Sequence, residues 1–449
     1  MGTMVNDLTK GNVTKLLIKF AMPLFLSNAL QAIYNIVDMI VVGQYIGGAG
    51  MSAVSIGGDI LHLLTFVAMG FSSAGQVIIA QDVGAGNFEK VKKTIGTMFT
   101  FLLIASLGIS VICYIIRDSI LTWVNTPQES YKYTMDYTVT CIVGLVFIYG
   151  YNIVSAILRG MGDSKRPFWF IVIAAILNII LDIYFVAYCG MEVMGAALAT
   201  VIGQAVSFII SIIYLYRSRE SFCFDFKLKS FKVDKQALSR LVKLGVPMAI
   251  QSAAVSFSKI VLMAWINMYG VVYSALAGIF NKVNVMSAII SNSFTTAGSA
   301  MVGQNLGAKK YERVPEILKT VAIFSFAITG VLCAVMLIFP KQVYGAFTSD
   351  AAVLAVAGIL TAPIILNFIG SATRSISFSI INGSGNTKLN FAVAIIDGII
   401  SRIGISALLG FTFGMECLGF WYGDSIAGFV PIIIGMSFYL SGKWKQRRD

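Results

Sequence analysis

The sequence predicts an all-α membrane protein with twelve transmembrane helices in two six-helix lobes related by an internal repeat. Apolar residues make up 57% of the 449 positions and charged residues only 12%, which excludes an ordinary soluble enzyme. Apolar runs long enough to cross a bilayer, about 20 residues each, follow one another along the chain. Two motifs also recur at a spacing of 223 residues, which indicates duplication.

Charges, glycines and prolines divide the chain into twelve apolar segments. The first contains Pro23 and Asp38 and lacks a small-residue cleavage site, so we expect it to stay as a helix rather than be removed as a signal peptide. Each half holds six helices, an even number, so the repeats run in the same direction, as in transporters. The expected helices lie near residues 15–46, 50–80, 93–116, 133–158, 167–189, 191–216, 240–268, 271–303, 315–339, 353–381, 389–411 and 415–441.

Positive charge alternates between successive connections. One side carries 24 Lys and Arg residues, whereas the other carries only Arg117, Lys132 and Lys341. The positive-inside rule then places both termini in the cytoplasm and the protein in the cell membrane as a multi-pass protein. This asymmetry accounts for most of the net charge of +12, so we expect no nucleic-acid partner.

The duplication predicts where the lobes divide. Residues 74–91 match residues 297–314, and residues 159–165 match residues 382–388 at the same offset. The one long polar stretch falls between the two copies. We therefore expect an amino-terminal lobe over 1–216, a cytoplasmic linker over 217–243 and a carboxy-terminal lobe over 244–449.

A polar stripe crosses the first expected helix. Asn28, Gln31, Asn35 and Asp38 are spaced by 3, 4 and 3 residues, which places them on one helical face. A charged side chain in mid-bilayer costs about 2.5 to 3.5 kcal/mol, and intramembrane acids usually mark ion or proton paths. We interpret Asp38 in this way, while the amides could instead form hydrogen bonds between helices.

A second acid lies in the fifth expected helix. Asn178 and Asp182 are four residues apart and share a face. If Asp38 and Asp182 meet, the two carboxyl groups could share a proton near neutral pH, or the same oxygen atoms could hold Na⁺. Possible further ligands are Thr200, Gln204 and Asn152, with helix packing as the alternative for Thr200 and Asn152.

The second half is more basic within its expected helices. Buried charges normally need partners, so we expect Arg402 to pair with Asp397. Lys282 and Arg374 are candidates for binding anionic or zwitterionic groups. The charged residues of these helices are Lys259, Lys282, Arg374, Asp397, Arg402 and Asp424.

Enzyme motifs are absent from the sequence, with one string to exclude. Gly160-Met161-Gly162-Asp163 matches the GxGD string of intramembrane aspartyl proteases, but it lies in a basic turn and its repeat copy ends in Asn386. A turn therefore explains it better. No serine–histidine arrangement, HExxH string, P-loop or CxxC pair occurs, so we expect no catalytic residue, cofactor, soft-metal site or disulfide framework.

Two motifs together resemble the MATE (multidrug and toxic compound extrusion) family. They are Pro23 followed by Val37-Asp38-Met39-Ile40-Val41-Val42-Gly43, and the Arg159-Gly160-x-Gly162-Asp163 turn. Asn178 and Asp182, with Thr200 and Asn152, are similar to the amino-terminal-lobe cation site of the family's DinF-like branch, and length and polar pattern are similar to its MepA-like members. The resemblance implies coupling at these residues and Asp38, and bending of the first helix near Pro23.

The second lobe departs from the family's NorM-like branch, which has a Glu in the seventh helix and an Asp in the tenth. The corresponding faces carry Gln251, Ser252, Val255 and Ser256, then Asn367, Ser371 and Arg374. Coupling should therefore rest on the first lobe. Residues expected to line the substrate cavity are Asn28, Gln31, Tyr34, Asn35, Gln204, Gln251, Ser256, Lys282 and Arg374.

The resemblance and the intramembrane acids imply a secondary antiporter. It would export amphipathic, cationic drugs or toxic compounds in exchange for H⁺ or Na⁺ by alternating access, as a monomer whose partners are small amphipathic molecules and the lipid bilayer. Two alternatives stay open: a lipid-linked precursor flippase of the same superfamily, favoured by the basic second lobe, and an intramembrane aspartyl protease, favoured only by the GxGD string.

Overall fold

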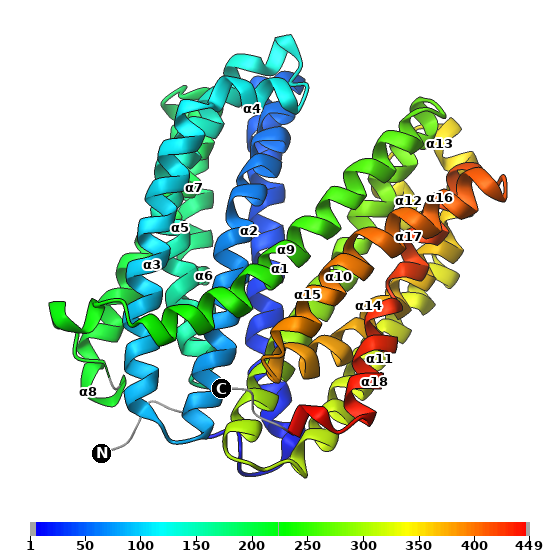
Figure 1. The fold of residues 1–449 in the computed structure, drawn as a ribbon. Coiled ribbons are helices and arrows are strands. Elements are labelled where there is room, and N and C mark those ends of the chain that lie inside the picture. The colour runs from blue at the N-terminus through cyan, green and yellow to red at the C-terminus, as the bar shows by residue number, and fades with distance from the viewer. Residues whose placement is uncertain (1–5, 223, 446–449) are drawn as a thin grey trace. The chain divides into compact units, whose positions relative to one another are not determined.

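The computed structural model describes residues 6–222 and 224–445, and within these ranges it contains helices and no strand. Twelve of its helical segments are long and apolar enough to cross a membrane, which confirms the predicted fold class (Figure 1). They are Val13–Ile46, Gly48–Gly84, Phe88–Ile115, Gln128–Gly160, Lys165–Tyr188, Glu192–Arg217, Lys235–Asn267, Val271–Gly307, Arg313–Ile338, Ala351–Gly383, Thr387–Thr412 and Glu416–Leu440.

The chain forms two compact units. Unit 1 consists of residues 6–7 and Met22–Val246, and unit 2 of Leu8–Ala21 and Pro247–Asp449 as far as the structure describes them. The main helices of unit 1 are α1 (Val13–Ile46, from Met22 on), α2 (Gly48–Gly84), α3 (Phe88–Ile115), α5 (Tyr131–Gly160), α6 (Lys165–Asp182) and α7 (Glu192–Arg217). Those of unit 2 are α9 (Lys235–Asn267, from Pro247 on), α10 (Val271–Gly307), α11 (Arg313–Ile338), α14 (Thr361–Gly383), α15 (Thr387–Ile395), α16 (Arg402–Ala407), α17 (Glu416–Ala427) and α18 (Val430–Leu440).

The duplication is visible in the backbone. Residues with positive φ, where the chain turns between helices, recur at 223 or 224 residues. The pairs are Gly47 with Gly270, Gly86 with Lys309, Gly162 with Gly385, Gly190 with Gly414, and Glu192 with Glu416. The same turns therefore join corresponding helices in both units.

Corresponding helices also pack alike. In unit 1, α5 packs against α2, α3 and α7, and in unit 2, α14 packs against α10, α11, α17 and α18. Glycines permit the close approach: a Cβ on Gly160 would lie 2.8 Å from the Gln76 carbonyl oxygen, and one on Gly383 would lie 3.0 Å from the Ser299 carbonyl oxygen. Small residues at such crossings let membrane helices pack closely without a hydrophobic driving force.

Two long helices pass from one unit to the other at a proline. Unit 2 contributes α1 up to Ala21, two residues before Pro23, and unit 1 contributes α9 up to Val246, immediately before Pro247. A proline inside a helix removes one backbone hydrogen bond. Each helix is therefore weakened at or beside the point where its packing partners change.

Residues 8–11 are held by unit 2. The Leu8 backbone N–H donates to Gln304 Oε1 at 3.0 Å, and Lys310 Nζ donates to the Thr9 carbonyl oxygen at 2.8 Å. Arg313 Nη2 donates to the Gly11 carbonyl oxygen at 2.9 Å. These bonds join residues about 300 positions apart, which the sequence pattern does not indicate.

The polar stretch between the halves packs on α3. Lys92 Nζ lies 3.0 Å from Asp225 Oδ2, and Thr100 Oγ1 donates to the Phe231 carbonyl oxygen at 2.5 Å. Arg240 Nη1 lies 2.9 Å from Oδ2 of the fully buried Asp82. By packing, residues 224–246 belong with unit 1, while the functional division into lobes over 1–216 and 244–449 stays a prediction.

Candidate functional site

Unit 1 brings four of the expected cation-coupling residues together. Asp38 comes from α1, Asn178 and Asp182 from α6, and Thr200 from α7. Thr200 Oγ1 donates to Asp38 Oδ2 at 3.4 Å. With its amide nitrogen facing α1, Asn178 donates to Asp38 Oδ1 at 3.0 Å, and its oxygen lies 3.3 Å from Thr200 Oγ1.

The local backbone helps to place Asp182. Regular α-helix ends at this residue, and the chain continues as a π-helix over Ile183–Tyr188. π-Helical turns are rare and occur frequently at functional sites. Asp38 is 3% exposed and Asp182 is fully buried, so both acids lie away from solvent and lipid.

The two carboxyl groups lie within hydrogen-bonding reach of each other. Neither oxygen of Asp182 accepts a hydrogen bond from any N–H or O–H group in the described residues. Two negative carboxylates in contact in an apolar interior repel each other strongly. Such a pair therefore shares a proton or binds a cation. The Asp38–Asp182 pair can therefore hold one proton, or a hard cation, which prefers oxygen ligands.

The surroundings of this pair are partly polar. The buried Tyr34 side chain lies beside Gln204. Asn152, the fifth expected coupling residue, donates from its amide nitrogen to the Ile148 carbonyl oxygen of its own helix at 2.8 Å, and no hydrogen bond joins it to the Asp38–Asp182 pair.

The four residues of the polar stripe on α1 differ in how far they are exposed. Asp38 is buried, Asn28 and Gln31 are half-buried, and Asn35 is exposed. Pro23, the expected hinge, lies within the continuous helix α1, where its carbonyl oxygen accepts a hydrogen bond from Ser27 Oγ at 2.8 Å.

A charged network occupies the interior of unit 2. Arg374 Nη2 lies 2.7 Å from Asp397 Oδ2, Arg402 Nη2 lies 3.7 Å from Asp397 Oδ1, and Arg402 also pairs with Asp424. The pair between Arg402 and Asp397 expected from their spacing is therefore present. Spacing did not indicate the other two pairs, because they join residues 22 and 23 positions apart.

The other residues expected in the substrate cavity of the second lobe lie on α9 and α10. Gln251 and Ser256 on α9 are half-buried, and Lys282 on α10 is exposed. Arg374 is 19% exposed and is engaged by Asp397.

The GxGD string forms a turn. Asp163 Oδ1 accepts hydrogen bonds from the backbone N–H groups of Lys165 at 3.0 Å and Arg166 at 3.3 Å, and its carboxylate pairs with the Arg166 side chain. In the repeat copy, Asn386 accepts a hydrogen bond from the Leu389 N–H group at 3.1 Å. Both strings form a turn, as the sequence suggested, and both side chains accept hydrogen bonds from the first N–H groups of the helix that follows.

The chain matches known proteins along its whole length. The MatE family model matches twice, over residues 23–184 and 247–408. The probable multidrug resistance protein YoeA of Bacillus subtilis is 27% identical over 98% of this chain and 96% of its own. The multidrug export protein MepA of Staphylococcus aureus is 22% identical over 87% of this chain and 86% of its own.

Solved structures share the fold. A crystal structure of MATE in complex with MaD3S superposes with a TM-score of 0.89 at 20% identity, covering 99% of this chain and 100% of the other. A MOP superfamily transporter from Pyrococcus furiosus superposes with a TM-score of 0.89 at 21% identity, with the same coverage.

Proposed function

Because the chain belongs to the MatE family of multidrug efflux transporters, we propose that it is a secondary antiporter that exports amphipathic, cationic drugs in exchange for H⁺ or Na⁺. As a member of a transporter family it is not an enzyme, which removes the aspartyl protease alternative. The observation that carries the proposal is the buried contact of Asp38 with Asp182.

The cation would act at this pair. A proton or Na⁺ taken up from outside neutralises one of the two negative charges of the Asp38–Asp182 pair, while Asn178 and Thr200 supply further oxygen atoms. An empty pair would keep two facing negative charges, which is costly in an apolar interior. Occupancy by the cation therefore favours one conformation of α1 over another.

Export follows if drug and cation prefer different conformations. Coupling requires only that each ligand binds the alternating states with different affinity. Pro23 lies fifteen residues before Asp38 on the same helix, where a missing hydrogen bond lowers the cost of bending. In the proposed cycle, cation uptake bends α1 near Pro23, drug is released outside, and cation release inside resets the helix.

The flippase alternative needs basic side chains that are free to bind an anionic lipid head group. Arg374 is already engaged by Asp397, which weakens this alternative. Lys282 remains exposed on α10. Proteoliposome export of drugs distinguishes the two functions.

The test is efflux of a fluorescent lipophilic cation from proteoliposomes under a pH gradient and, separately, a Na⁺ gradient. We expect efflux under one of the two gradients and its loss in Asp38→Asn and Asp182→Asn. Asp118→Asn, which removes an exposed acid from the same unit, is the matched control and should export normally. Normal gradient-driven efflux in Asp38→Asn, or no efflux by the wild type under either gradient, would overturn the proposal.

A further inference from the structure

An acid without a partner lies on the surface of unit 1, within a membrane-spanning helix. Asp59 is the twelfth residue of α2, about 16 Å from its first residue at a rise of 1.5 Å per residue. Leu61, two residues later, packs against the same apolar cluster as Val37 of α1. Since Val37 directly precedes Asp38, Asp59 lies at about the depth of that acid. Asp59 is exposed, and its carboxylate forms no hydrogen bond or ion pair with any described residue.

The face of α2 around Asp59 is polar. Ser55, Asp59 and His62 are spaced by 4 and 3 residues, so they share one side of the helix, and all three are exposed. His62 interacts electrostatically with Asp59 but is not bonded to it. Charged side chains inside a membrane are costly against lipid and almost always face water or the protein interior. The exposed face that carries Asp59 therefore faces water rather than lipid.

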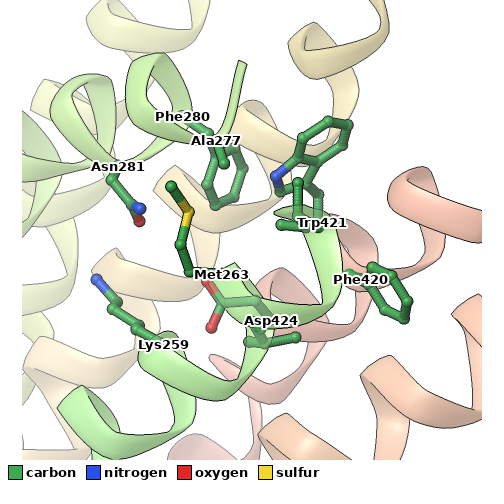
Figure 2. A pocket seen from close by; sticks show the side chains of 10 residues that line it. Lys259, Met263, Ala277, Phe280, Asn281, Phe420, Trp421 and Asp424 are labelled. Atoms are coloured by element: carbon green, nitrogen blue, oxygen red, sulfur yellow. The ribbon is translucent and has the colours of Figure 1, made fainter. Parts of the chain in front are cut away.

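Acids inside the helices of unit 2 are held differently. Asp397 pairs with Arg374, and Asp424 pairs with Arg402. Figure 2 shows Asp424 among the side chains that line a small pocket, where it is 4% exposed. Arginines balance these two buried charges, whereas the exposed charge of Asp59 is left for a ligand.

The corresponding position of the second repeat is also exposed. It is occupied by Lys282 on α10, 223 residues after Asp59. This point on the helix therefore faces away from the core in both units. Because the two copies carry opposite charges, the charge itself is not needed to pack the helix.

We infer that Asp59 binds the positively charged group of the exported organic cation, a role that rests on the proposed export function. Of the ligands proposed for this protein, a substrate with one ammonium or phosphonium group carries the charge that balances a single carboxylate. The apolar part of the substrate lies over the neighbouring ring of His62, which itself contacts Phe66 with ring centroids 4.8 Å apart. Selection of cationic substrates and coupling to H⁺ or Na⁺ then use different acids, Asp59 for the substrate and the Asp38–Asp182 pair for the coupling ion.

Equilibrium binding of two matched probes tests the inference without any gradient. The probes are tetraphenylphosphonium, a permanent cation, and triphenylphosphine oxide, a neutral molecule with the same aryl groups. Both are titrated calorimetrically into the full-length protein in nanodiscs at about pH 8, where a histidine is ordinarily neutral, with empty nanodiscs subtracted. We expect the cation to bind about ten-fold or more tightly, because opposite charges attract more strongly at a protein surface than in bulk water.

Variants assign this preference to Asp59. Asp59→Asn should reduce it about ten-fold, and Asp59→Glu, which keeps the charge, should retain most of it. Asp118→Asn is the matched control and should keep the preference, since Asp118 is an exposed aspartate of the same unit outside α2.

Reaction of an introduced thiol tests whether this face of α2 meets water. In a chain whose six native cysteines are replaced by alanine, Asp59→Cys should react with the water-soluble anionic reagent 2-sulfonatoethyl methanethiosulfonate. The attached sulfonate should then restore the preference for the cation. Ile104→Cys is the control, because Ile104 is an apolar residue on α3 that is 64% exposed and should face lipid, so its thiol should stay unreactive.

Three outcomes would overturn the inference: equal affinity of the wild type for both probes, an unchanged preference in Asp59→Asn, or no reaction at Asp59→Cys. Loss of the preference in Asp38→Asn but not in Asp59→Asn would assign the substrate charge to the coupling pair and overturn it as well. If Asp59→Asn does not fold, the Asp59→Cys chain before and after labelling makes the same comparison. Because binding is measured at equilibrium, a preference that depends on Asp59 without gradient-driven efflux would refute the antiport function and leave the role of Asp59 intact, and efflux without the preference would do the reverse.

Discussion

Replacement of Arg402 by methionine should destabilise unit 2 strongly. The Arg402 side chain is 2% exposed, and its two partners, Asp397 and Asp424, are 0% and 6% exposed. Removing one partner of a buried ion pair costs about 3 to 5 kcal/mol, because the other charge stays buried without compensation. Arg402→Met leaves Asp424 without its cation, so we expect a loss in this range.

The matched comparison is Arg374→Met. Arg374 is 19% exposed, and Asp397 would keep Arg402 at 3.7 Å, so this change should cost only about 1 to 3 kcal/mol. Adding Asp424→Asn to Arg402→Met removes the unpaired charge and should restore at least about 1 kcal/mol.

A buried thiol gives the readout. Cys417 is 2% exposed and is the second residue of α17, the helix that carries Asp424. In a variant that keeps only this cysteine, its reaction with a thiol-specific fluorophore during denaturation reports the unfolding free energy of unit 2. A loss for Arg402→Met no larger than that for Arg374→Met, or a further loss on adding Asp424→Asn, would refute the reasoning.

Three further predictions concern unit 1. Gly160→Ala should destabilise it by about 1 to 3 kcal/mol, because the new methyl group meets the Gln76 carbonyl oxygen at 2.8 Å, whereas Gly108→Ala, with no atom within 4 Å, should be neutral or stabilising by up to about 1 kcal/mol; thermal unfolding in detergent separates the two. Arg240→Met should cost about 3 kcal/mol by leaving the buried Asp82 without its arginine, and Asp82→Asn in the same chain should recover part of it, as measured by the same assay. The Ser230 hydroxyl, followed by Lys92, lowers the pKa of the Asp225 carboxyl; its contribution to docking of the 224–234 stretch should therefore persist above about pH 4 and be lost only as pH falls through the lowered pKa, and a ¹³C NMR titration showing an ordinary pKa would contradict this.

The sequence by itself determined the number of membrane-spanning helices and the duplication. Hydrophobic runs report spans directly, because a bilayer requires helices of a set length with internally satisfied backbones. Asp38 and Asp182 could also be identified from the sequence as candidate cation-binding residues. A charged side chain inside the membrane is energetically costly and usually has a function. Short-range geometry was equally readable, as the Asp163 turn and the spacing of Arg402 and Asp397 illustrate.

Only the tertiary structure decided which charges meet. Asp38 contacts Asp182, which lies 144 positions later in the chain. From the sequence alone, this contact could be stated only as a condition for the cation site. Arg402 pairs with Asp424 as well as with its near neighbour Asp397. Pairing of buried charges depends on distances between helices that fold together from remote parts of the chain, and periodicity within one helix carries no record of those distances.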